Sequence, residues 1–174
     1  PWDLLERWAT AGELPNFERL LTEGAAGPLE STTPPTTALA WPSLATGVGP
    51  DTHGLYSFRR LRPDYTHRMN TSGDVAAPTL WDLLSPAVVG NVPMTYPARP
   101  IDGELVTGMM TPTFDDRATH PPELAAEITD AIPDYRVGLD WNEYTDRPDE
   151  LAADLAEIVA ARRELMRLLM ARED

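Results

Sequence analysis

Hydrophobic and polar positions along the chain follow two kinds of pattern, one typical of helices and one typical of strands. Short apolar runs at residues 87–94 and 103–110 are suited to buried strands. Longer stretches repeat apolar residues at helical spacing, several of them with an early proline or a closing glycine. Helices that alternate with short buried strands predict an α/β fold, with a mixed or parallel sheet flanked by helices. The predicted helices cover residues 2–8, 15–24, 40–47, 78–84, 121–132 and 147–174.

The last of these helices has the most regular pattern. Its acidic residues come early and its arginines come late, as the helix dipole favours. The apolar stripe has two interpretations, a seam between subunits or a face that packs on the rest of the domain. Packing is favoured, because an amphipathic helix usually covers its own core. The stripe consists of Leu151, Leu155, Ile158, Val159, Arg162, Met166 and Leu169.

The length and composition fit a globular protein. With 174 residues and 42% hydrophobic content, we expect one domain over residues 1–174. Cysteine is absent, which excludes disulfides and thiolate metal sites, so any metal is held by oxygen or imidazole. No apolar run approaches the ~20 residues of a membrane span, and no signal-peptide pattern begins the chain. We therefore expect a cytoplasmic protein without membrane contact, and no feature specifies an oligomeric state.

The charge balance is strongly acidic. Twenty-eight acidic residues against 14 arginines give a formal net charge of −14, and lysine is absent. Such a surface repels phosphate groups in a polymer, so we expect neither nucleic acid nor an anionic membrane as a partner. The composition has two explanations, adaptation to high salt and a GC-rich genome that favours arginine over lysine. The charge excess and the missing lysine together favour salt adaptation.

Two adjacent threonines, Thr36 and Thr37, stand just before a helix-compatible run and after two prolines. A hydroxyl at a helix N-terminus lies where backbone N–H groups and the helix dipole favour an anion such as phosphate. A threonine needs a base or a metal to act as a nucleophile, and a divalent metal is the natural activator here. The alternative is a simple N-cap, which position alone favours.

The stretch "TTALAWPSLATGVGPDTHGLYSF" (residues 36–58) resembles the nucleophile region of the alkaline phosphatase superfamily. The closest branch is the type I phosphodiesterase/nucleotide pyrophosphatase group. Its members have a nucleophilic threonine or serine, a short helix that ends in Thr-Gly, a proline turn and His-Gly. Thr46–Gly47, Pro50 and His53–Gly54 match these landmarks. Counting back nine residues from Thr46, which is the family's spacing, gives Thr37 rather than Thr36.

The resemblance extends over most of the chain up to Pro112. The opening helix and "GELPNFERLLTEG" look like the start of the family, and "GNVPMTYPARPIDGELVTGMMTP" looks like the strand and proline-rich loop of one subgroup. The resemblance implies an alkaline-phosphatase-like fold and hydrolysis of a small-molecule phosphate ester. It implies that Thr37 attacks phosphorus, binds one of two divalent metal ions, with zinc the expected metal, and forms a phosphothreonine intermediate.

Two departures from the family's pattern limit this expectation. The family's metal-binding Asp before the first helix and its later Asp-His-Gly do not occur here, and the histidines are His53, His67 and His120. We therefore expect a partial domain, an interior piece of a longer enzyme that is inactive alone. Phe58 stands where the nucleotide pyrophosphatases have an asparagine that holds phosphate, so nucleotide specificity is in doubt.

Two other functions stay open. A sulfatase- or phosphomutase-like enzyme would use the same architecture, although sulfatases usually carry a modified Cys or Ser as the nucleophile. A non-catalytic, truncated binding module would use Thr37 only as a helix cap. The course of the helix is also open, because Pro42 either kinks a helix that begins at Thr37 or leaves Thr37 on a looser turn before a helix that starts near Trp41.

Weaker candidates have a structural and a functional interpretation each. His53 is interpreted as a structural turn histidine rather than a metal ligand. The basic cluster at Arg59–Arg62 could guide an anionic substrate, but pairing with the protein's own acids is favoured. Asp115 and Asp116 with His120 could bind a metal, but a solvated loop is favoured. By family analogy alone, two further residues are placed in the cleft near a strand end, Asn91 and Tyr96.

Overall fold

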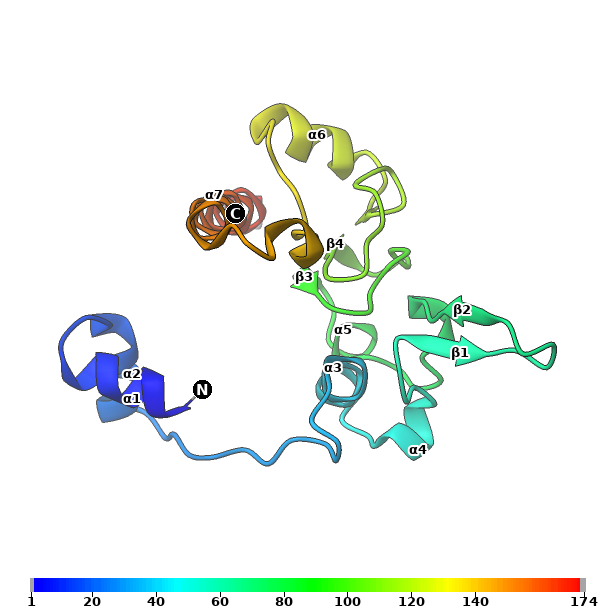
Figure 1. Cartoon of the computed structure of the whole chain (residues 1–174), viewed down its shortest axis with the longest axis horizontal. Helices are drawn as coiled ribbons and strands as arrows, with labels where there is room; N and C mark the ends of the chain where they lie inside the picture. The colour runs from blue at the N-terminus through cyan, green and yellow to red at the C-terminus, as the bar shows by residue number, and fades with distance from the viewer. Residues whose placement is uncertain (1, 173–174) are drawn as a thin grey trace. The chain divides into compact units, whose positions relative to one another are not determined.

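The computed structural model describes residues 2–172, and in it the chain divides into two units, Pro1–Ser31 and Thr32–Asp174. Figure 1 shows the course of the chain through the helices and strands of each unit. The elements are both helical and extended, with a small mixed sheet flanked by helices. The predicted α/β class, with a mixed sheet flanked by helices, is confirmed. One domain over residues 1–174 stays an expectation.

The first unit contains the two helices predicted at the start of the chain. Helix α1 covers Trp2–Thr10, and α2 covers Pro15–Glu23 with its proline at the first turn. Gly12 lies between them at φ 74°, a left-handed conformation that glycine adopts without steric cost. Both helices are amphipathic, and Ala9 of α1 is buried.

The sheet of the second unit consists of β3 (Ala87–Val92), β4 (Gly103–Thr107) and β5 (Thr119–His120). β3 runs parallel to β4, and β5 pairs antiparallel with the other edge of β4. The two predicted strands are therefore confirmed, each ending a few residues before the end of its apolar run. β3 and β4 stop where their segments continue into loops that contain proline or glycine.

Two helices cover the sheet and close its core. α6 spans Leu124–Ala131 and α7 spans Pro148–Met170, and Figure 1 draws them above β3 and β4. Tyr135, on the segment between them, meets Phe114 edge to face with ring centroids 4.7 Å apart. The side chains of this cluster are almost fully buried: Val106, Leu124, Ile128, Tyr135, Leu165 and Leu169.

The stripe predicted for the last helix is correct in its main positions, but it includes one exposed residue and omits one buried residue. Ile158 and Leu169 are buried, whereas Val159 is 64% exposed. Leu165, which the prediction omitted, is fully buried. The buried face of α7 includes Leu165 because Leu165 and Leu169, one turn apart, both reach the core of the second unit. This helix packs within its own unit, as expected.

The remaining elements of the second unit are short. Helix α3 covers Thr37–Thr46, α4 covers Pro50–His53 and α5 covers Leu80–Leu83. The 3₁₀ turns η1 and η2 cover Ser72–Asp74 and Trp141–Tyr144. The strands β1 (Arg59–Leu61) and β2 (His67–Met69) form an antiparallel hairpin that the sequence pattern did not predict. Within residues 2–172, no helix is both long and apolar enough to cross a membrane.

Candidate functional site

The first of the two threonines ends the extended approach, and the second opens helix α3. Thr36 is the N-cap with an extended backbone, φ −110° and ψ 148°, and no side-chain hydrogen bond caps the helix. The carbonyl of Thr36 accepts hydrogen bonds from the N–H groups of Leu39 and Ala40, at 3.1 and 2.9 Å. The N–H groups of Thr37 and Ala38 donate to no backbone acceptor in the described chain. Ala38 is buried and Thr37 is partly exposed, so the start of α3 presents the N–H of Thr37 beside its hydroxyl.

Helix α3 continues through Pro42. Of the two possibilities that the sequence left open, the helix therefore starts at Thr37 and not near Trp41. α3 begins at Thr37 and runs for ten residues, with Pro42 buried inside it. Proline has no N–H group, so the carbonyl of Ala38 loses its usual partner in the helix. The end of α3 is the predicted one, because Gly47 adopts φ 69° and its N–H donates to the carbonyl of Ser43 at 2.8 Å.

His53 is a buried link between α3 and α4. Its Nδ1 accepts a hydrogen bond from the N–H of Leu55 at 3.2 Å, so the proton of the neutral ring is on Nε2. Nε2 lies 3.0 Å from Oγ of Ser43 and donates to it. Burial lowers the pKa of His53 below its usual value, which favours this neutral form. The geometry agrees with the interpretation of His53 as a structural histidine.

Asn91 and Tyr96 lie at and beyond the carboxyl end of β3. Asn91 forms a bulge at φ 58°, and its Oδ1 accepts a hydrogen bond from the hydroxyl of Tyr135 at 2.8 Å. Burial raises the pKa of Tyr135 to about 12, so this hydroxyl remains a donor. Tyr96 lies under the guanidinium of Arg117, 5.7 Å from the ring centroid. Asn91 is therefore hydrogen-bonded to Tyr135, a residue of the core. The sequence analysis did not predict this contact.

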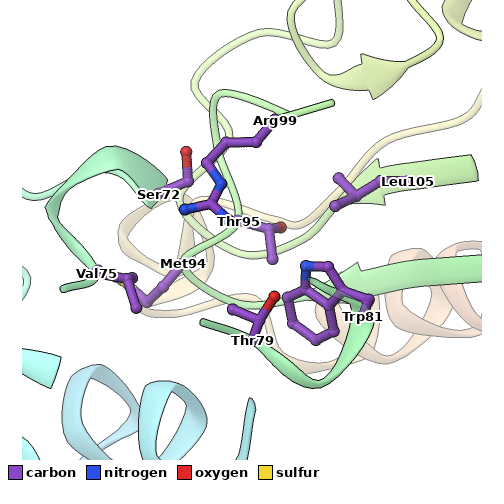
Figure 2. Close-up of a pocket in the computed structure, with 8 residues that line it drawn as sticks. All are labelled: Ser72, Val75, Thr79, Trp81, Met94, Thr95, Arg99 and Leu105. Atoms are coloured by element: carbon purple, nitrogen blue, oxygen red, sulfur yellow. The ribbon is translucent and has the colours of Figure 1, made fainter. Parts of the chain in front are cut away.

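A small pocket of about 30 Å³ lies next to these loops, between α5 and the ends of the strands (Figure 2). Figure 2 shows Arg99 and Trp81 at its border, with Thr79 and Thr95 facing the same space. Arg99 donates to both carboxylate oxygens of Asp82, at 3.0 and 2.8 Å. The hydroxyl of Thr79 donates to Asp82, and that of Thr95 donates to a backbone carbonyl. A space of this size holds about one or two water molecules, so it does not fit a phosphate ester.

The arginines of the predicted basic cluster differ in their partners within the hairpin. Arg60 and Arg68 are paired across the two strands and both contact Asp74, with Arg68 at 2.5 Å and Arg60 at 3.6 Å. The guanidinium of Arg68 is the main reason that the pKa of Asp74 lies well below its usual value, despite partial burial. The expected pairing with the protein's own acids therefore holds for Arg60. It does not hold for Arg59 or Arg62, which form no ion pair with the described carboxylates.

The acidic loop near the sheet does not assemble into a metal site. Asp115 forms an ion pair with Arg117 at 2.9 Å, and this pairing lowers the pKa of the carboxyl. His120 lies in β5 opposite Leu105. Among residues 2–172, no three His, Asp or Glu side chains gather as metal ligands would. These residues therefore do not fit a two-metal site by themselves.

Two local arrangements that the sequence analysis missed have a clear sequence signal. Thr71 with Asp74, and Thr79 with Asp82, each form a capping box around η1 and α5. In both cases the carboxylate accepts from the backbone N–H and the hydroxyl of the threonine three residues earlier. The spacing Thr-x-x-Asp is the known signature of this arrangement, and it occurs twice within residues 71–82.

Comparison with protein families gives an independent view of the same chain. Residues 1–167 match the family described as type I phosphodiesterase / nucleotide pyrophosphatase. Comparison with curated proteins and with solved structures gave no match. The matched range includes α3 with Thr37, the His53 turn, the sheet and most of α7. The chain therefore belongs to the type I phosphodiesterase/nucleotide pyrophosphatase family, a family of hydrolases.

Proposed function

We propose that this chain carries the nucleophile of a phosphodiester hydrolase, and that the nucleophile is Thr37. Membership of the family supports the reaction class. The observation that carries the assignment is the position of Thr37 as first residue of α3, where two backbone N–H groups lack a backbone acceptor. Thr36, by contrast, supplies the carbonyl that closes the first helical turn. The two threonines therefore differ in role although they are adjacent.

The proposed step transfers the phosphoryl group to the protein. A bond forms between Oγ of Thr37 and phosphorus, the bond from phosphorus to the leaving oxygen breaks, and that oxygen leaves with the electron pair. The proton of the Thr37 hydroxyl passes through water to the departing oxygen, which leaves as an alcohol. The N–H group of Thr37, together with the dipole of α3, stabilises the negative charge on the phosphoryl oxygens. Water then attacks phosphorus, the bond from phosphorus to Oγ of Thr37 breaks, Oγ takes up a proton, and a phosphate monoester is released.

We propose bound metal ions only for the intact enzyme. The family resemblance implies two divalent ions, with zinc expected, and Thr37 as one ligand. The described residues do not form a site for these ions. We propose that their other ligands come from residues beyond those described here, and that the 174 residues alone do not turn over substrate.

The decisive experiment compares the two threonines in the intact enzyme with an aryl phosphodiester as substrate. Thr37→Ala should lower kcat by about a thousandfold or more, because the nucleophile is removed. Thr36→Ala is the matched control and should stay within about threefold, because its contribution to α3 comes from the backbone carbonyl. Near-normal turnover by Thr37→Ala would rule out the assignment. Faster turnover of an aryl sulfate than of the diester would favour the sulfatase alternative.

A further inference from the structure

Helix α3 lacks two of the restraints that usually hold the first turns of a helix. No side-chain hydrogen bond caps its N-terminus. Pro42 has no N–H group, so the carbonyl of Ala38 has no partner within the helix. The turn that begins with Thr37 is therefore joined to the rest of α3 by one backbone hydrogen bond fewer than a regular turn. The position of Thr37 depends correspondingly more on contacts that other segments make with α3.

The buried ring of His53 lies against α3 on both sides of this interruption. Its Nε2 donates to Oγ of Ser43, the residue after Pro42, at 3.0 Å. Burial lowers the pKa of His53, and the carbonyl of Leu39, one helical turn before Ser43, is one of the groups that partly oppose this effect. Leu39 lies two residues after Thr37 and is itself buried. The ring therefore links the turn that carries Thr37 to the second half of the helix.

The backbone of His53 is held by a different segment. Its carbonyl accepts a hydrogen bond from the N–H of Ala76 at 3.0 Å. Four residues before Ala76, the buried Ser72 donates from its N–H to the carbonyl of Tyr96 at 2.8 Å. The hydroxyl of Ser72 donates to the carbonyl of Pro97 at 2.5 Å. Tyr96 and Pro97 belong to the loop that follows β3, so His53 connects α3, through residues 72–76, to the loop at the carboxyl end of that strand.

We propose that His53 and Ser43 are positioning residues, which hold the hydroxyl of Thr37 in its reactive place relative to the loop after β3. This inference rests on the proposed function and adds to it the contacts that orient the nucleophile. Neither residue touches the reacting atoms, because Ser43 lies six residues after Thr37, about 9 Å along the helix axis. A misplacement of about 1 Å at the reacting atoms lowers a rate by about a hundredfold, so a loosened α3 should lower kcat.

The first test compares side chains of graded similarity in the intact enzyme, with an aryl phosphodiester as substrate. Ser43→Ala removes the acceptor, and His53→Asn has a side chain too short to reach Ser43. Both variants should lower kcat about tenfold to a hundredfold and change KM less than about twofold. Ser43→Thr keeps the hydroxyl, and His53→Gln keeps an N–H group at a similar reach, so both should retain kcat within about fivefold. If Ser43→Thr is as slow as Ser43→Ala, the hydroxyl is not what positions the helix, and the proposal is wrong.

Tyr144→Phe is the matched control for a general loss of stability. It also removes one side-chain hydrogen bond of a partly buried group, but this bond joins η2 to Asp154 of α7 and not to α3. At a temperature where circular dichroism shows every variant folded, the control should keep kcat within about twofold. An equal fall in kcat in the control and in Ser43→Ala would overturn the proposal, and so would an unchanged kcat in Ser43→Ala.

The second test uses the 174-residue chain and needs no turnover. The N–H of Ala40 donates to the carbonyl of Thr36 at 2.9 Å, so its hydrogen exchange, followed by NMR, reports on the first turn of α3. Ser43→Ala should speed this exchange about tenfold relative to the amide of Leu165 in α7, whereas Tyr144→Phe should not. Unchanged exchange at Ala40 in Ser43→Ala would overturn the proposal.

The two tests also separate this inference from the assignment of the nucleophile. If Thr37→Ala keeps its activity, the proposed nucleophile is wrong. The exchange at Ala40 still decides whether Ser43 and His53 restrain the start of α3.

Discussion

Nε2 of His53 lies 3.0 Å from Oγ of Ser43, and this hydrogen bond joins the short helix α4 to the helix that begins at Thr37. The other ring nitrogen accepts from the N–H of Leu55, so both nitrogens of a fully buried ring have partners. A buried polar group that is fully hydrogen-bonded stabilises one arrangement of its neighbours. The His-Gly turn after α3 therefore fixes the position of this helix.

Ser43→Ala should destabilise the protein, because it leaves the Nε2–H of His53 buried without an acceptor. The expected cost is about 1–3 kcal/mol in the free energy of unfolding. Urea denaturation followed by circular dichroism measures it. Thr52→Ala, at an exposed position of helix α4, is the control and should change stability by less than about 0.5 kcal/mol. Equal stability of the two variants would show that the link does not matter.

Stability should fall as the pH drops below about 6.5, because His53 binds a proton more readily in the unfolded chain than in the folded one. Burial lowers its pKa in the folded state, so the unfolded state takes up more protons in this range and gains stability. The slope should stay below ~1.4 kcal/mol per pH unit, which is the limit for the uptake of one proton. Denaturation at about pH 5 to 8 should show this slope in the wild type and in His67→Gln, and a smaller slope in His53→Gln. An unchanged slope in His53→Gln would assign the effect to other groups.

Asp74→Asn should loosen the hairpin, because the amide cannot replace the charged contacts to Arg68 and Arg60. The carboxylate also caps η1 through Thr71, so two functions are lost together. The expected cost is about 1–3 kcal/mol, with faster hydrogen exchange of the hairpin amides than of the β3–β4 amides. Asp64→Asn, in the exposed turn of the same hairpin, is the control; it keeps an Oδ1 acceptor for the N–H of Thr66 and should change exchange less than Asp74→Asn does. Exchange that rises equally in both strand pairs would contradict a local role.

Gly108→Ala should destabilise the protein, because it disturbs the contact between the end of β3 and the loop that follows β4. A Cβ at this position would overlap the backbone carbonyl groups of Asn91 and Val92, and backbone atoms cannot move aside cheaply. We expect a loss of about 1–3 kcal/mol in thermal or urea unfolding. Gly138→Ala is the matched control, because no atom beyond its chain neighbours lies within 4 Å of the position that its Cβ would take. This control should stay within about 0.5 kcal/mol of the wild type, and two equally stable variants would show that the loops adjust freely.

Much of the fold was predictable from local sequence. The helices at α3 and α7 and the strands β3 and β4 occur where the apolar spacing placed them. Helix ends followed from single residues, such as Gly47 at the end of α3. These features depend on contacts within a few residues, which the sequence pattern shows directly. The hairpin was missed because its strands are only three residues long and largely exposed, so no apolar alternation marks them.

Some features of the candidate site were also predictable from the sequence, and others were not. The landmarks by which the family resemblance points to Thr37, Thr-Gly and His-Gly, can be read in the sequence by itself because they are local, and the role of Thr37 stays a prediction. Only the tertiary structure decided that α3 starts at Thr37 despite Pro42, that His53 binds Ser43, and which hairpin arginines lack a carboxylate. It also joined Asn91 to Tyr135, 44 residues away. Such pairings depend on how distant segments pack in space, and the order of residues along the chain does not show this.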